Sequence, residues 1–180
     1  STLSAYLIVP RLVEVIEKKT ILLIAISFAA LIPPIPIILF INNLLPDTGT
    51  WNLFYATIPF VYVANTCLSS SAIIRESMLG DISDEVELES GIGQQGLMFA
   101  SSSLIGKLNT GLGILMAGIT LEFINFPQGT DVTPSAENIF NLAMVQGPLV
   151  AILMIIPFGI FSLYKIDRYR HQQILAKLNH

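Results

Sequence analysis

The sequence predicts an all-α membrane protein whose helices cross the bilayer several times, and two observations support this prediction. Of the 180 residues, 53% are hydrophobic and 12% are charged, whereas a soluble domain typically has about 25% charged residues. Apolar runs of about 20 residues recur along the chain, and an α-helix of that length can cross a hydrocarbon layer about 30 Å thick. The lipid bilayer is therefore the first expected partner of this chain.

Four full spans are predicted, at residues 20–42, 53–75, 96–124 and 139–164, after the end of an earlier span at residues 1–10. The first residues lack the charged start and the small-residue cleavage site of a signal peptide, so we interpret them as the end of a helix that began upstream. We therefore expect the chain to be part of a longer membrane protein.

The first full span contains Pro33, Pro34 and Pro36. Each proline lacks a backbone donor and bends a helix, and neighbouring helices must then cover the freed carbonyl groups. The pattern predicts a kinked helix inside a bundle, which is either an irregular packing helix or a hinge.

The span at 53–75 is rich in hydroxyl and amide side chains, and Asn65 and Ser69 lie one helical turn apart on one face. Such groups in a membrane helix either bond to a neighbouring helix and to their own backbone, or contact a solute. Both interpretations stay open. Arg75 marks the end of this span.

The segment 80–95 is acidic and contains glycines, and it includes Asp81, Asp84 and Glu85. Its charges predict a solvated loop between two spans. A calcium-binding loop is the alternative, although the ligand spacing of an EF-hand is absent.

Lys107 stands about twelve residues into the next span, roughly 18 Å along a helix, which places it near the middle of the bilayer. A lysine at that depth costs about 2.5–3.5 kcal/mol, so we expect an acidic partner or a water-filled cavity beside it. The predicted spans hold no acid at a comparable depth, so the partner is expected from elsewhere. Ser103, Lys107 and Thr110 share one helix face, which predicts a polar stripe facing away from lipid. The alternative is a lysine that reaches the boundary with water or bonds to backbone carbonyls.

The basic residues outside the spans lie on one side of the membrane if the spans alternate in direction, and the positive-inside rule makes that side cytoplasmic. They are Arg11, Lys18 and Lys19 in the first link and Lys165, Arg168, Arg170 and Lys177 in the C-terminal tail. The C-terminus is therefore expected in the cytoplasm.

Several classes of function are not expected. The chain has no basic cluster with interleaved aromatic residues, so we expect no nucleic-acid partner. It has no G-x-S-x-G motif and no cluster of metal ligands, since His171 and His180 both lie in the tail. We therefore expect no enzyme, no bound metal and no cofactor.

The run SMLGDISDEVELESGIGQQGLMFASSSLIGKL resembles the link between the tenth and eleventh helices of the glycoside-pentoside-hexuronide:cation symporters, the group of the major facilitator superfamily that contains melibiose permease. The residues that match the order of that motif are Asp81, Asp84, Glu85, Gly91, Gly96 and Lys107. The chain departs from the motif at Gly93 and Gln95, where the family usually has arginine and glutamate, so one charge pair is missing.

The resemblance implies that the chain is part of the C-terminal six-helix bundle of a transporter that moves a small solute by cation-coupled symport and alternating access. A sugar or glycoside is the expected solute, and a lysolipid is a variant that the family allows. The coupling ion, Na⁺ or H⁺, is expected to bind mainly to the N-terminal half, which is itself an expected partner. A bacterial inner membrane is the expected location.

The resemblance also implies roles for individual residues. Lys107 is expected beside the central cavity, paired with an acid of the other half, and Ser103, Thr110, Asn65 and Ser69 are candidates for the pathway of solute and cation. Arg75, Asp81, Asp84 and Glu85 are candidates for a cytoplasmic gate. The alternative from another class is a small membrane scaffold or assembly subunit with about four spans and no transport of its own.

Overall fold

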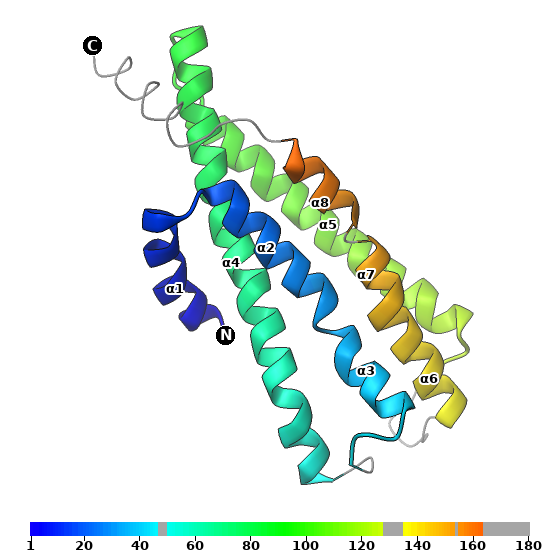
Figure 1. The fold of residues 1–180 in the computed structure, drawn as a ribbon. Coiled ribbons are helices and arrows are strands. Elements are labelled where there is room, and N and C mark those ends of the chain that lie inside the picture. Colours follow the sequence, from blue (N-terminus) through cyan, green and yellow to red (C-terminus); the bar gives the residue numbers. More distant parts are fainter. Residues whose placement is uncertain (47–49, 128–134, 154, 164–180) are drawn as a thin grey trace.

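The computed structural model describes residues 1–46, 50–127, 135–153 and 155–163, and these residues form helices and connecting turns with no β-strand among them. The expected all-α architecture is confirmed (Figure 1). The elements in chain order are α1 (Thr2–Val15), α2 (Lys18–Leu31), α3 (Pro34–Ile41), α4 (Trp51–Ser90), α5 (Gln95–Phe123), α6 (Ala136–Met144), the π-helix η1 (Val145–Leu149), α7 (Val150–Leu153) and α8 (Ile155–Ser162).

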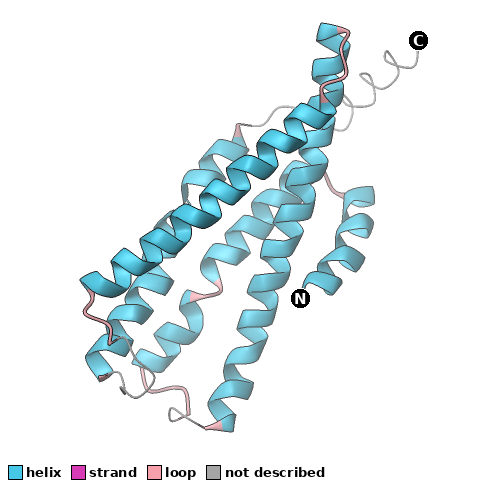
Figure 2. Ribbon diagram, turned by 180° about the vertical axis from the view of Figure 1, so that it is seen from behind, coloured by secondary structure: helices cyan, strands magenta, loops and turns pink. Residues whose placement is uncertain are grey.

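α4 is the longest helix, and both α1 and α2 pack against it, whereas α7 and α8 pack against α2 (Figures 1 and 2). The buried core lies where α1, α2 and α4 meet, and Phe161 of α8 packs against it. Its buried members are Val9, Ile21, Leu22, Ile26, Ile74 and Met78.

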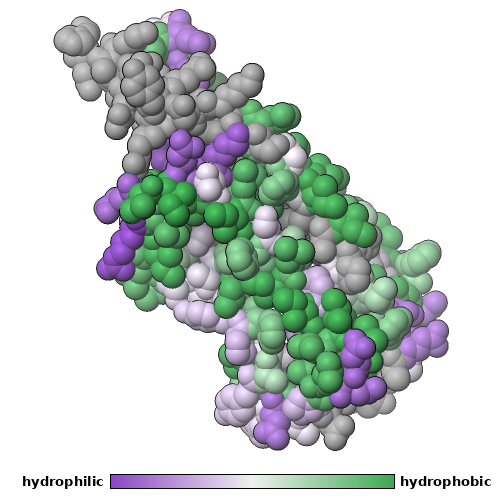
Figure 3. Space-filling model, in the orientation of Figure 1, coloured by the Kyte–Doolittle hydropathy of each residue, from purple (hydrophilic) through white to green (hydrophobic). Residues whose placement is uncertain are grey.

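Within the part of the chain that the structure describes, three stretches are long and apolar enough to cross a membrane: Lys18–Ile41, Trp51–Ser90 and Gln95–Phe123. No residue of α5 is buried, and most of its large apolar side chains are exposed. Figure 3 shows apolar side chains over the middle of the molecule and polar side chains mainly towards its two ends. An apolar surface of this size is suited to lipid or to other membrane helices.

The first predicted span consists of α2 and α3, with the break at Ile32 and Pro33. The break falls at the prolines, as expected, because Pro34 cannot donate a backbone hydrogen bond to the preceding turn. The last predicted span is also interrupted. It contains η1, whose wider turn coincides with Gly147 and Pro148.

The polar link expected after residue 10 is mostly helical. α1 contains Pro10 and continues to Val15, and only Ile16 and Glu17 separate it from α2. Val9, on the turn that contains Pro10, is buried in the core, and this packing offsets the loss of one backbone donor.

The prediction of a loop at 80–95 is wrong, because α4 continues to Ser90. Between Arg75 and Ser90 the weakest helix former is Gly80, which costs about 1 kcal/mol relative to alanine. Packing of Met78 and an ion pair of Asp81 with α2 stabilise this part of the helix. α4 ends at Gly91, whose φ of 70° is the left-handed conformation that glycine adopts readily.

Candidate functional site

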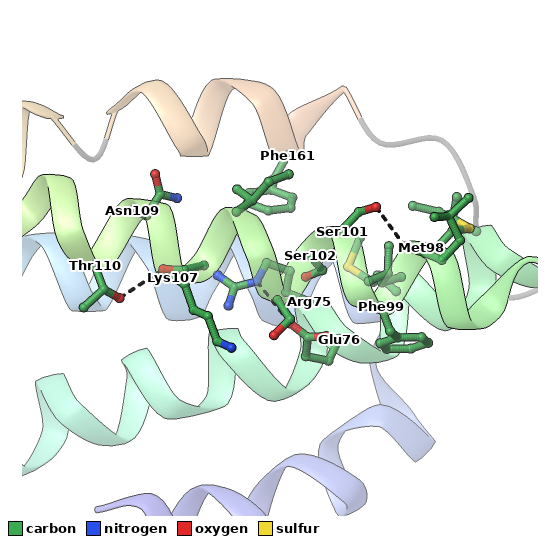
Figure 4. Close-up of a pocket in the computed structure, with 17 residues that line it drawn as sticks. Arg75, Glu76, Met98, Phe99, Ser101, Ser102, Lys107, Asn109, Thr110 and Phe161 are labelled. Atoms are coloured by element: carbon green, nitrogen blue, oxygen red, sulfur yellow. Dashed lines mark hydrogen bonds and ion pairs between the residues drawn. The ribbon is translucent and has the colours of Figure 1, made fainter.

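A cleft of about 1290 Å³ lies between the C-terminal part of α4, the first half of α5 and Phe161 of α8 (Figure 4). Three charged side chains line it among the described residues, Arg75 and Glu76 from α4 and Lys107 from α5. The other lining residues are Met78, Leu79, Ile82, Leu97, Met98, Phe99, Ser101, Ser102, Ser103, Ile105, Gly106, Asn109, Thr110 and Phe161. The cleft therefore combines charges, hydroxyl groups and aromatic rings.

The hairpin of α4 and α5 brings these residues together. The turn after Gly91 reverses the chain, so α5 starts beside the end of α4 and then diverges from it (Figure 2). Arg75 lies about 24 Å before this turn and Lys107 about 20 Å after it, at about 1.5 Å per residue. The two cationic residues therefore lie at a similar distance from the tip of the hairpin.

The charged part of α4, from Arg75 onward, is helical, and Lys107 lies across the cleft from this stretch. The charges of the two helices therefore lie on either side of one cleft. The expected position of Lys107 near the middle of the bilayer stays a prediction.

The Lys107 side chain is exposed, and among the described residues no carboxylate oxygen lies within 4.0 Å of its ammonium group. Arg75 has a distant ionic partner, since its Nε lies 3.9 Å from Oε1 of Glu76, the next residue in the chain. Both of those side chains are about half exposed, so the pair contributes little to stability.

Ser103 and Thr110 line the cleft together with Lys107, which is the arrangement that their helical spacing predicts. The Thr110 hydroxyl donates to the backbone carbonyl of Gly106 at 3.0 Å. Four polar lining residues were not predicted for this region: Glu76, Ser101, Ser102 and Asn109. The three consecutive serines, residues 101–103, were a signal that could have indicated it.

Asn65 and Ser69 lie on α4 but are not among the described residues that line the cleft. The Asn65 amide donates to the carbonyl of Val61 at 2.8 Å, and the Ser69 hydroxyl lies 3.3 Å from that of Thr2. One of these side chains bonds to its own helix and the other to a neighbouring helix, which is the packing interpretation that the sequence left open.

The candidate gate residues lie on the helical extension of α4 rather than in a loop. Asp81 is only 8% exposed, and its two carboxylate oxygens accept from the Lys18 ammonium at 2.7 and 2.8 Å. Asp84 accepts from the Gln95 side-chain amide at 3.2 Å, and Glu85 lies on the same extension. Lys18 thus ties the start of α2 to α4. In the described part of the chain no group of three or more histidine, cysteine, aspartate or glutamate residues could hold a metal ion.

The fold and the cleft define an α-helical membrane protein of several spans with a charged and hydroxyl-rich cleft near the end of its apolar region. A family model described as MFS/sugar transport protein matches residues 1–168, so the chain belongs to this family of major facilitator transporters. No curated protein and no solved structure matches the chain. The basic tail residues from Lys165 on lie outside the described part of the chain.

Proposed function

We propose that this chain is the C-terminal part of a secondary active transporter that moves a small solute across the membrane by alternating access. The cleft is the observation that supports this proposal most directly, because it places Lys107, Ser103 and Thr110 together in a chain of a transporter family. In such transporters two helical bundles rock about a site at their interface. The exposed face of α5 would meet the other bundle there.

A sugar or glycoside is the proposed solute, and its uptake is proposed to be driven by Na⁺ or H⁺. The description of the family as sugar transport proteins supports the solute class. Hydroxyl and amide groups such as Ser102 and Asn109 can bond to sugar hydroxyls, and the rings of Phe99 and Phe161 offer apolar faces in the same cleft. The coupling ion is proposed to bind mainly in the N-terminal half.

We further propose a cytoplasmic position for the charged extension of α4. Arg11, Lys18 and Lys19 lie at the same end of the molecule as this extension, since Lys18 pairs with Asp81. The positive-inside rule assigns that end to the cytoplasm, and the membrane is proposed to be a bacterial inner membrane. The acids Asp81 and Asp84 would then take part in a gate on the cytoplasmic side.

The substitution Lys107→Ala in the full-length transporter tests the proposal. We expect cation-driven solute uptake into cells to fall at least ten-fold while the amount of inserted protein stays unchanged, because the cleft loses a charge that faces solute or its counter-charge. Arg11→Ala is the matched control, since Arg11 is an exposed cation on α1 outside the cleft. Normal uptake by the Lys107→Ala variant would remove the lysine from the mechanism.

A further inference from the structure

We infer that Glu76 is the charge partner of Lys107 when the cleft narrows during transport, and that this pair fixes α4 against α5. The inference rests on the proposed transport function and adds a positioning residue to it. It also replaces the expectation that the partner of Lys107 comes from outside the described helices.

The cleft contains one acid and two cations among its described residues. Glu76 is the only carboxylate among the described residues that line it, whereas Arg75 and Lys107 provide two cations. A lysine next to an apolar span is stabilised by a carboxylate or by water. Within the described part of the cleft, Glu76 is the one acid that can form an ion pair with Lys107.

Glu76 and Lys107 lie at similar distances from the turn that joins α4 to α5. Glu76 lies about 22 Å before Gly91, and Lys107 lies about 20 Å after Gln94, at about 1.5 Å per residue. They come from facing stretches of α4 and α5, as Figure 4 shows. Inward movement of α5 would therefore bring Lys107 towards Glu76 without sliding one helix along the other.

The contact that Glu76 makes with Arg75 is weak. The separation of 3.9 Å from the Arg75 Nε is at the outer limit of an ion pair, and Glu76 retains 47% side-chain exposure. A half-exposed pair of this kind holds a carboxylate weakly. Glu76 could therefore exchange Arg75 for Lys107 as its partner at little cost in free energy. A transporter that alternates between two states requires two arrangements of similar free energy.

Charge reversal in the full-length transporter tests the inference. We expect Glu76→Lys and Lys107→Glu to lower cation-driven uptake at least ten-fold each, because each gives positions 76 and 107 the same charge. The double variant with both substitutions restores the opposite charges, and we expect its uptake to return to within about three-fold of the wild-type rate. Glu89→Lys is the matched control, because Glu89 is exposed on the same helix outside the cleft, and we expect near-normal uptake from it.

Cross-linking provides a second measurement that does not depend on uptake. In a Cys67→Ser background, the pair Glu76→Cys and Lys107→Cys is treated with thiol cross-linkers of increasing length. We expect a short cross-linker to join the two positions and saturating solute to change the yield by at least three-fold. A yield that is independent of solute, or the absence of cross-linking with every reagent, would overturn the inference.

The outcomes separate this inference from the proposed function. If Lys107→Ala abolishes uptake and the double reversal fails to restore it, the transport role of Lys107 stands and its pairing with Glu76 is wrong. If Lys107→Ala leaves uptake normal, the role of the lysine in transport is wrong, whatever the cross-linking shows.

Discussion

At the scale of single residues, we predict that Ser103 and Thr110 are accessible to water, since both line the cleft beside Lys107. Cysteines placed at these two positions, in a Cys67→Ser background, should react with water-soluble thiol reagents, and solute should slow the reaction at least three-fold. The reason is that a cleft open to water exposes these positions until solute fills it. The measurement is the rate of labelling in membranes.

Leu108→Cys is the control for this labelling, because Leu108 is exposed on α5 but does not line the cleft. Its labelling should be slow and indifferent to solute. Unreactive cysteines at both position 103 and position 110 would show that the stripe packs against another helix.

A second prediction at this scale concerns the contribution of the ion pair between Lys18 and Asp81 to stability. Asp81→Asn leaves the Lys18 ammonium without its carboxylate, and Asp81 is 8% exposed. We expect the free energy of unfolding to fall by about 1–3 kcal/mol, seen as a lower midpoint of thermal unfolding in detergent. Asp84→Asn should cost clearly less, because the bond of Asp84 to Gln95 is exposed. Equal effects of the two substitutions would contradict this account.

Individual contacts could be predicted where helical spacing alone decides them. The shared face of Ser103, Lys107 and Thr110 follows from their positions in one helix. Glu76 was missed because its nearness to Lys107 depends on how two helices approach each other. The same reason explains why Asp81 was assigned to a loop although it pairs with Lys18.

At the scale of elements, two helix interruptions meet at one contact. A Cβ atom added to Gly147 in η1 would lie 2.8 Å from Cδ1 of Ile37 and 3.6 Å from Cα of Pro34, both in α3. Because residue 147 is glycine, η1 can pack closely against α3, the helix that follows the proline kink. The proline kink before α3 and the π-helix η1 are therefore packed against each other.

Relative to Gly118→Ala, Gly147→Ala should therefore lower the stability of the protein in detergent by about 1 kcal/mol, because the added methyl group forces the end of the Ile37 side chain to shift. The substitution Ile37→Val removes the methyl group that clashes, so combining it with Gly147→Ala should recover part of the loss. Gly118→Ala on α5 is the control, since nothing lies within 4 Å of a Cβ there. A loss of stability at Gly118 equal to that at Gly147 would contradict the packing explanation.

At the scale of the whole molecule, α4 is longer than a membrane is thick. Its 40 residues span about 60 Å, about twice the thickness of the hydrocarbon layer. The part from Arg75 to Ser90 carries the charges, so we expect this part to extend into water, and α5 begins beyond its end. The cleft is then expected where the apolar layer meets this extension.

Labelling with a membrane-impermeant thiol reagent tests this placement. In the Cys67→Ser background, Glu89→Cys should be labelled only from the cytoplasmic side and Asn52→Cys, at the other end of α4, only from the opposite side. The expectation follows from the length of α4 and the positive-inside rule. Labelling of both positions from one side would show that α4 does not cross the membrane.

The sequence by itself determined that this is a helical membrane protein, because apolar runs of about 20 residues have the length of a membrane-spanning helix. The major facilitator class was indicated by the resemblance of the segment that contains Asp81 and Lys107. The sequence also determined the kink at Pro33 and the polar face around Lys107, since both depend on neighbours within one helix. Only the tertiary structure decided that the acidic segment is helical, that Lys107 lies level with Arg75, and that Glu76 shares their cleft. These features arise from packing between helices, where Lys18, Met78 and the hairpin turn at Gly91 outweigh local preference.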